Sequence, residues 1–222
     1  MNFRKSLLRI LFLLMAAYCA GTLPLASLVC LSDHYRAETM LEFTRKLAHL
    51  RSLKYAKVGD SLVAQEADWG SLLGGSRFSA INLGTPGHTI SQIQAQLDNA
   101  AHLKPRYVSI MAGTNDYSQG RTDEQILADF ERLLQHAHEL GLHTVLVTSI
   151  PLRADTIHDP HLTVLNRRLQ EVVEANGSTF LNLNSAILNT ANRAALFQSD
   201  GLHFAGGMYD LWARLLREHT KS

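Results

Sequence analysis

Five short apolar runs, separated by helical patterns, constrain the fold of this chain more than any other feature. The runs have the β-branched and aromatic character of buried strands, and glycine or proline follows most of them. Strands that alternate with helices join through right-handed crossovers into a parallel sheet that is covered on both faces. The predicted strands cover residues 55–58, 80–83, 107–111, 144–148 and 179–183.

Between and after these runs, apolar residues recur at the spacing of amphipathic helices. One predicted helix begins with Thr122 and Gln125, which form a capping box, and ends before Gly141. The sequence therefore predicts an α/β fold, a three-layer α/β/α flavodoxin-like domain with a five-stranded parallel sheet. The expected helices cover about 62–73, 90–103, 122–140, 162–175 and 208–219.

The first 32 residues predict a segment that crosses a membrane. Three basic residues precede an uncharged run over residues 10–31, which at about 1.5 Å per residue can cross a hydrocarbon core of about 30 Å. We expect a signal anchor over residues 1–32 that places the rest of the chain outside the cytoplasm, although basic residues flank the run on both sides. Two alternatives stay open: a signal peptide cleaved near Cys19, giving a secreted protein, and a lipoprotein acylated at that cysteine.

Residues 33–54 follow with apolar side chains at helical spacing among charges. This pattern predicts an amphipathic helix that connects the anchor to a domain over residues 55–222. We expect the helix to pack against the domain; the alternative is that it lies on the membrane surface.

Composition argues against several classes of protein. The formal net charge is +1, which gives no support to nucleic-acid binding. The only cysteines, Cys19 and Cys30, precede the predicted domain, so the domain has neither a disulfide nor a cysteine-based metal site. Glycine-rich nucleotide-binding motifs do not occur either.

Ser61 stands where the first predicted strand turns into a helix, directly after Gly59 and Asp60. A hydroxyl at this position lies at the carboxyl edge of the sheet, where open α/β folds place their ligands. It also lies at a helix N-terminus, where free N–H groups and the helix dipole favour negative charge. This environment suits a serine nucleophile, and the alternative is that Asp60 or Ser61 only caps the helix.

Reactive side chains and glycine turns also follow later parts of the sheet. Gly87 follows the second strand, Asn115 follows the third, and Asp200 and His203 lie near the C-terminus. In a parallel sheet these turns meet at one edge. Together with Ser61 they supply the nucleophile, base, orienting carboxylate and oxyanion donors of an acyl-transfer site.

Each role has a physical reason. Serine needs a neighbouring base at neutral pH, and the imidazole of His203 can provide it. Asp200, three residues earlier, can orient the ring if the segment forms a helical turn. The N–H groups of Ser61 and Gly87 and the amide of Asn115 are candidate oxyanion donors. Taken singly, these residues are more often turns or caps, and it is their combination in chain order that favours catalysis.

From about residue 55 onward the chain resembles the SGNH, or GDSL, hydrolase superfamily. The superfamily's Ser, Gly, Asn and His markers match Ser61, Gly87, Asn115 and His203, and its triad carboxylate falls on Asp200. The glycine turn, the Gly-Thr-Asn block and the Gly-Gly-x-Tyr ending over 206–209 resemble the platelet-activating-factor acetylhydrolase catalytic-subunit type. The resemblance implies a metal-independent serine esterase without a cofactor. Such an enzyme forms an acyl-enzyme on Ser61, which water activated by His203 then hydrolyses.

Two positions depart from the superfamily pattern. His88 stands where an acidic residue usually follows the second-block glycine, and Phe204 replaces the usual Pro or Thr after the last-block histidine. His88 changes the local charge near the predicted oxyanion donors, and Phe204 either lines the substrate pocket or packs in the core.

The sequence therefore predicts an envelope-facing esterase for O-acetyl sugars, short-chain esters or lysophospholipids, with a small-molecule, glycan or lipid ester as partner. One alternative is an acyltransferase that passes the acyl group to an envelope glycan. Another is a non-catalytic binding module, which the intact set of site residues argues against. The sequence at 158–161, His-Asp-Pro-His, fits a polar loop at the rim of the site better than a metal site.

Overall fold

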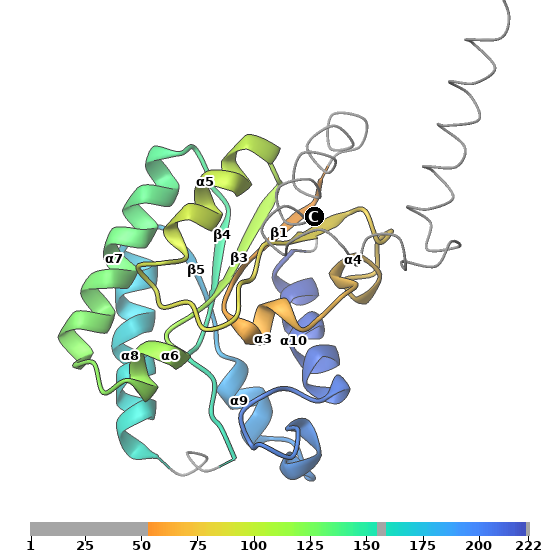
Figure 1. Ribbon diagram of the computed structural model, residues 1–222, viewed down its shortest axis with the longest axis vertical. Helices are drawn as coiled ribbons and strands as arrows, with labels where there is room; N and C mark the ends of the chain where they lie inside the picture. Colours follow the sequence, from red (N-terminus) through yellow and green to blue (C-terminus); the bar gives the residue numbers. More distant parts are fainter. Residues whose placement is uncertain (1–52, 155–158, 221–222) are drawn as a thin grey trace, which may run out of the picture. The chain divides into compact units, whose positions relative to one another are not determined.

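A parallel sheet forms the centre of the protein, with its strands in the order β2-β1-β3-β4-β5 (Figure 1). The computed structural model describes residues 53–154 and 159–220. The sheet confirms the predicted five-stranded α/β architecture. Its strands are β1 (Tyr55–Gly59), β2 (Ala80–Asn82), β3 (Tyr107–Met111), β4 (Val145–Thr148) and β5 (Thr179–Leu181).

Helices cover both faces of the sheet (Figure 1). Successive side chains of a strand point to opposite faces, so Tyr55 and Ala56 of β1 lie in two different apolar clusters. One cluster lies beneath α5 (Gln94–Leu103), α7 (Asp123–Glu139) and α8 (Pro160–Ala175). The other lies beneath α4 (Trp69–Leu72), α9 (Leu183–Leu188) and α10 (Gly206–His219).

Lys57 breaks the apolar pattern in the middle of β1, yet its side chain is fully buried. Its Nζ donates to Ser109 Oγ at 2.8 Å and lies 4.0 Å from the ring centroid of Trp69 and 3.7 Å from that of Trp212. Desolvation by burial lowers the pKa of the amine well below its usual value. The hydroxyl and the two aromatic faces therefore replace the water that the amine has lost.

Several element boundaries differ from the expected ones. The predicted helix over 62–73 is two single turns, α3 (Ser61–Ala64) and α4, and the helix expected from residue 90 begins only at Gln94. The fifth strand ends at Leu181, because Asn182 accepts a hydrogen bond from the Ser185 N–H and starts α9. The elements α6 (Thr114–Ser118) and η2 (Arg193–Leu196) were not expected. The capping box at Thr122 and Gln125 is confirmed at the start of α7.

The predicted signal anchor, residues 1–32, lies outside the described residues, as does the connecting helix over 33–52. The last two residues of that predicted helix, Leu53 and Lys54, belong to no helix. Within 53–154 and 159–220, every helix is too short or too polar to span a bilayer.

Candidate active site

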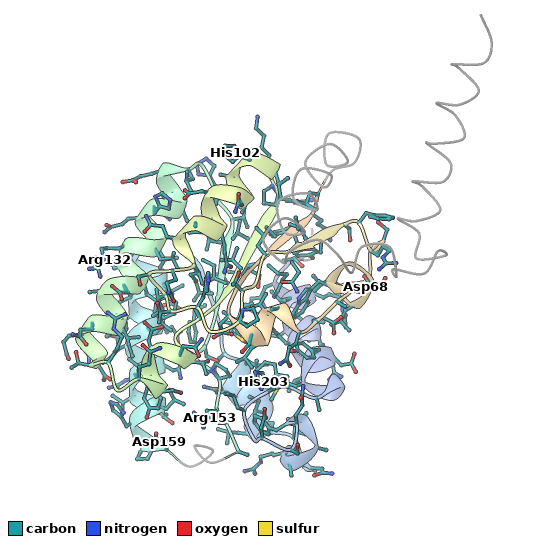
Figure 2. The ribbon with its side chains drawn as sticks, in the orientation of Figure 1. Asp68, His102, Arg132, Arg153, Asp159 and His203 are labelled. Carbon is teal, nitrogen blue, oxygen red and sulfur yellow. The ribbon has the colours of Figure 1, made fainter. Side chains whose placement is uncertain are left out.

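Three short helices begin near the carboxyl ends of the strands, at the lower end of the sheet in Figure 1. The first, α3, follows β1, α6 follows β3, and α9 follows β5. This edge carries Ser61 at the start of α3 and Asn115 on α6. The loop with Asp200 and His203 reaches the same edge from the segment between η2 and α10, and Figure 2 shows His203 beside α3.

The turn from β1 into α3 has room for few side chains. A Cβ atom at Gly59 would lie 2.1 Å from the Met111 carbonyl oxygen, so only glycine fits. Asp60 caps α3 by accepting from the Leu62 N–H at 2.9 Å, and Tyr209 on α10 donates to the Leu62 carbonyl at 2.9 Å. The capping interpretation therefore holds for Asp60, and the hydroxyl of Ser61 has a different partner.

That partner is His203, and the structure brings Ser61, His203 and Asp200 into one hydrogen-bonded chain. The Oγ atom of Ser61 lies 3.1 Å from Nε2 of His203, and Nδ1 of the same ring lies 2.6 Å from Oδ2 of Asp200. The side chain of His203 is 24% exposed, so the ring is held in place and still open to solvent. This is the geometry in which a base activates a hydroxyl while a carboxylate orients the base.

Asp200 and His203 do not lie on a helical turn, so that part of the expectation was wrong. Residues 199–203 form turns and bends. Asp200 Oδ1 accepts from the N–H groups of Leu202 and His203 at 2.9 Å each. This side-chain-to-backbone pairing closes the turn without a helix and leaves Oδ2 for the imidazole.

Two carboxyl groups of the site have opposite electrostatic environments. The hydrogen bond from His203, with the two backbone N–H groups, lowers the pKa of Asp200 to about 2. Burial raises the pKa of Asp60 to about 6, against the hydrogen bond from Leu62. Its Oδ2 atom is buried and has no hydrogen-bond partner among the described residues. Asp200 is thus ionised at every working pH, whereas Asp60 gains or loses its charge close to neutrality.

Gly87 and Asn115, the two further predicted oxyanion donors, are connected by His88. Asn115 Nδ2 donates to the His88 carbonyl oxygen at 2.9 Å, and Gly87 directly precedes His88. Gly87 has φ +79°, and a Cβ there would meet no atom within 4 Å. Glycine is therefore favoured at this position by the positive φ angle, and not by a lack of space for a side chain. Phe204, the other position that departs from the superfamily pattern, packs in the apolar cluster beneath α10.

Two buried polar residues that the sequence analysis did not select bond backbone groups close to the predicted oxyanion donors. Asp116 accepts from the Ile90 N–H at 3.0 Å and from Arg121 Nη1 at 2.7 Å. Gln96, which is 5% exposed, bonds both the N–H and the carbonyl of Gly59. A signal for Gln96 was present, because a glutamine on the apolar face of a helix requires a buried partner.

The polar loop expected at the rim is partly described. Asp159 accepts from the His161 N–H at 2.9 Å and so caps α8, whereas His158 lies outside the described residues. Within the described ranges, no group of three or more His, Cys, Asp or Glu side chains could hold a metal ion.

Solved structures of bacterial proteins share this fold. A lipase/acylhydrolase from Enterococcus faecalis aligns with TM-score 0.64 and 23% identity, over 75% of this chain and 94% of that one. A GDSL-like lipase from Bacteroides thetaiotaomicron aligns with TM-score 0.62 and 18% identity, over 81% and 96%. A structure from Streptococcus pneumonia whose name refers to platelet activating factor gives TM-score 0.62 and 19% identity, over 82% and 91%. At these identities the likeness shows the fold.

One curated relative matches part of the chain. The N-acylneuraminate cytidylyltransferase of Streptococcus agalactiae is 28% identical over 133 residues, which is 59% of this chain. The match spans 32% of that protein. The chain thus corresponds to about a third of that relative's length. The activity given in the relative's name belongs to that whole protein.

The family model matches most of the domain described above. The model of the GDSL-like Lipase/Acylhydrolase family aligns with residues 57–211, a range that runs from β1 into α10 and contains the whole Ser61–His203–Asp200 chain. The chain belongs to the GDSL-like lipase/acylhydrolase family.

Proposed function

We propose that this hydrolase cleaves carboxylic esters through an acyl-enzyme on Ser61, with His203 as general base and acid and Asp200 as the group that orients the imidazole. The contacts of 3.1 Å from Ser61 Oγ to His203 and 2.6 Å from His203 to Asp200 carry the proposal. These contacts support the proposal, because His203 Nε2 faces the hydroxyl of Ser61 and the Asp200 carboxylate faces the far nitrogen of the same ring.

The reaction follows from that order of atoms. Ser61 Oγ attacks the ester carbonyl carbon while His203 Nε2 takes the hydroxyl proton. The oxyanion is received by the N–H groups of Ser61 and Gly87 and by the amide of Asn115. Collapse of this intermediate breaks the bond to the alcohol, which takes the proton from His203. Water then attacks the acyl group by the same steps and frees Ser61.

We propose an O-acetyl sugar, a short-chain ester or a lysophospholipid as the substrate. The turn that carries Asp200 and His203 is open to solvent, and the side chain of Asp200 is 48% exposed. An exposed triad is reached by a bulky alcohol portion such as a sugar. An acyltransferase would use the same acyl-enzyme and replace water with a sugar hydroxyl.

The test is ester hydrolysis by the full chain and by its Ser61→Ala variant. Turnover of p-nitrophenyl esters from acetate upward should disappear in the variant, because no other group would then form the acyl-enzyme. Ser185→Ala is the matched control, since Ser185 is an exposed serine on α9 that contributes its backbone N–H, and not its hydroxyl, to the cap at Asn182. Turnover that persists in Ser61→Ala would reject the nucleophile.

Covalent labelling gives a second readout. A fluorophosphonate should bond to Ser61 Oγ with loss of fluoride, and mass spectrometry of the digested protein should locate the adduct there. The fall in kcat/KM with acyl length then separates an acetyl esterase from a lipid hydrolase. Turnover that requires an added sugar acceptor would favour the acyltransferase.

We also propose that residues 1–32 anchor the protein in a membrane with the hydrolase domain outside the cytoplasm. The support is the uncharged run over 10–31 behind a basic N-terminus. Membrane fractions should retain the protein after alkaline carbonate washing, and protease added outside the cytoplasm should degrade the domain. Release into the soluble fraction would favour cleavage near Cys19.

A further inference from the structure

The strand that leads to Ser61 ends beside a buried glutamine. In the sheet β2 ends at Asn82, opposite Lys57, so β1 runs two residues further than its neighbour on that side. At this end of β1, the Gly59 N–H donates to Gln96 Oε1 at 2.8 Å, and Gln96 Nε2 donates to the Gly59 carbonyl at 2.9 Å. The side-chain amide thus pairs with Gly59 as the peptide of an adjacent strand would.

The same amide also contacts the loop that carries Gly87. The second hydrogen of Gln96 Nε2 points to His88 Nδ1 at 3.4 Å. A primary amide nitrogen can only donate, so His88 Nδ1 is the acceptor, and the ring proton of a neutral His88 is on Nε2. The oxygen and both amide hydrogens of Gln96 are therefore used between Gly59 and His88.

These contacts connect the two backbone groups proposed to receive the oxyanion. Gly59 lies two residues before Ser61, and His88 lies one residue after Gly87. Each short segment is held elsewhere as well, α3 by the Asp60 cap and His88 by Asn115. A backbone bond also joins the two segments, from the Thr85 N–H to the Gly59 carbonyl at 2.9 Å. Gln96 is the side chain that bonds both segments at once.

We propose that Gln96 is a positioning residue that sets the distance between the backbone N–H groups of Ser61 and Gly87. This inference depends on the proposed function, in which those two groups bind the oxyanion. Oxyanion donors act only at the position where the negative charge develops. A displacement of about 1 Å therefore weakens the binding of the transition state far more than the binding of the ester substrate. Loss of Gln96 should therefore lower kcat and leave KM almost unchanged.

A matched control exists on another helix. Asn166 on α8 holds the Ile150 backbone as Gln96 holds Gly59: the Ile150 N–H donates to Asn166 Oδ1 at 2.8 Å, and Asn166 Nδ2 donates to the Ile150 carbonyl at 3.0 Å. Asn166 is 7% exposed. Its removal should destabilise the fold by the same mechanism without moving the backbone N–H groups of Ser61 and Gly87.

The experiment measures kcat, KM and Tm for p-nitrophenyl acetate with the full chain. The variants are Gln96→Met, which keeps the volume and removes the amide, and Gln96→Glu, which keeps the shape and removes both N–H donors as a carboxylate. Their controls are Asn166→Leu and Asn166→Asp. We expect kcat of the Gln96 variants to fall by about 10- to 100-fold with KM within about threefold of wild type. The Asn166 variants should show a similar loss of Tm with kcat nearly unchanged.

Three results would overturn the inference: a wild-type kcat in the Gln96 variants that fold, an equal loss of kcat in the Asn166 variants, or failure of both Gln96 variants to fold. Ser61→Ala, measured in the same series, keeps the two proposals apart. If Ser61→Ala hydrolyses the ester at the wild-type rate, the proposed mechanism is rejected. If Ser61→Ala is inactive but the Gln96 variants keep the wild-type kcat, only the positioning role of Gln96 is rejected.

Discussion

Replacement of Asp200 by asparagine tests the proposed mechanism with the smallest change of shape. The two oxygens of Asp200 have different partners: Oδ1 accepts from the N–H groups of Leu202 and His203 at 2.9 Å, and Oδ2 lies 2.6 Å from His203 Nδ1. An asparagine has one oxygen and one NH₂ group for these two places. The backbone N–H groups of Leu202 and His203 determine the orientation of the asparagine amide, because they require an acceptor.

The amide oxygen should take the place of Oδ1, because the reverse orientation would press NH₂ against two N–H donors. The NH₂ group then faces His203 Nδ1 and requires that nitrogen to accept. In a neutral imidazole the proton must move to Nε2, which lies 3.1 Å from Ser61 Oγ. A protonated Nε2 cannot take the serine proton, so the base is lost although all the atoms are in place.

The expected loss is large and confined to chemistry. A triad with its imidazole in the wrong tautomer loses about 10⁴ in kcat, which corresponds to about 5.5 kcal/mol of transition-state stabilisation. The turn should survive, because the amide oxygen keeps both backbone hydrogen bonds. The pKa of Asp200, lowered to about 2, adds stability above the unfolded-state pKa of about 4 that is lost as pH falls towards 2. The variant lacks this contribution to stability at neutral pH. The contribution is small because the side chain of Asp200 is exposed to solvent.

The assay is the hydrolysis of p-nitrophenyl acetate at pH 7 to 8, with Asp210→Asn on α10 as the control at an exposed aspartate. Nitrogen-15 NMR of the His203 ring reports the tautomer directly. A kcat of Asp200→Asn within about tenfold of wild type would refute the reasoning, since a base in the wrong tautomer cannot support that rate. A protonated Nδ1 in the variant would refute the assigned orientation of the amide.

Two further substitutions test separate parts of the structure. Asn115→Ala should lower kcat by about 10²–10³, the usual loss for one oxyanion donor; an unchanged kcat would limit Asn115 to holding the His88 carbonyl. Lys57→Met should remove a pH dependence of stability. Burial lowers the folded-state pKa of Lys57, so the unfolded chain binds more protons between that pKa and about 10.4, and this residue makes stability rise with pH by up to about 1.4 kcal/mol per unit. Urea unfolding at pH 7 to 10 should show this rise in wild type relative to the variant, and parallel curves would contradict it.

The fold could be predicted because its pattern is local. Each buried strand is a short apolar run, and the capping box at Thr122 marks the start of α7. The end of α3, which was predicted wrongly, depends on contacts from elsewhere in the chain. Asn82 on β2 donates to the carbonyls of Val63, Ala64 and Glu66 and thereby ends α3, and no sequence window contains both partners.

The candidate site could be predicted in part for the same reason. Ser61, Asn115 and Gly87 each follow a strand, so the topology alone brings them to one edge. The turn at Asp200 was expected to be helical because the i, i+3 spacing is compatible with that geometry. The spacing alone cannot distinguish it from a turn closed by the aspartate's own oxygen.

Buried primary amides at this edge form a pattern that the hydrophobic periodicity hides. Parallel strands of unequal length leave peptide groups without a neighbour where the chains diverge, and a buried peptide group needs a partner. A side-chain amide offers one donor and one acceptor in the spacing of a peptide, so it can replace the missing strand. Gln96 does this for the Gly59 N–H and shares the Gly59 carbonyl with the Thr85 N–H. Asn166 pairs with Ile150, while Asn184 bonds the Leu152 N–H at 2.8 Å and the Ile150 carbonyl at 2.9 Å. The polar residues that interrupt the apolar faces of α5, α8 and α9 therefore mark the strand ends from which the loops of the site depart. A glutamine or asparagine at a core position of such a helix is thus a sequence signal in its own right, and in α5 that signal points to Gln96.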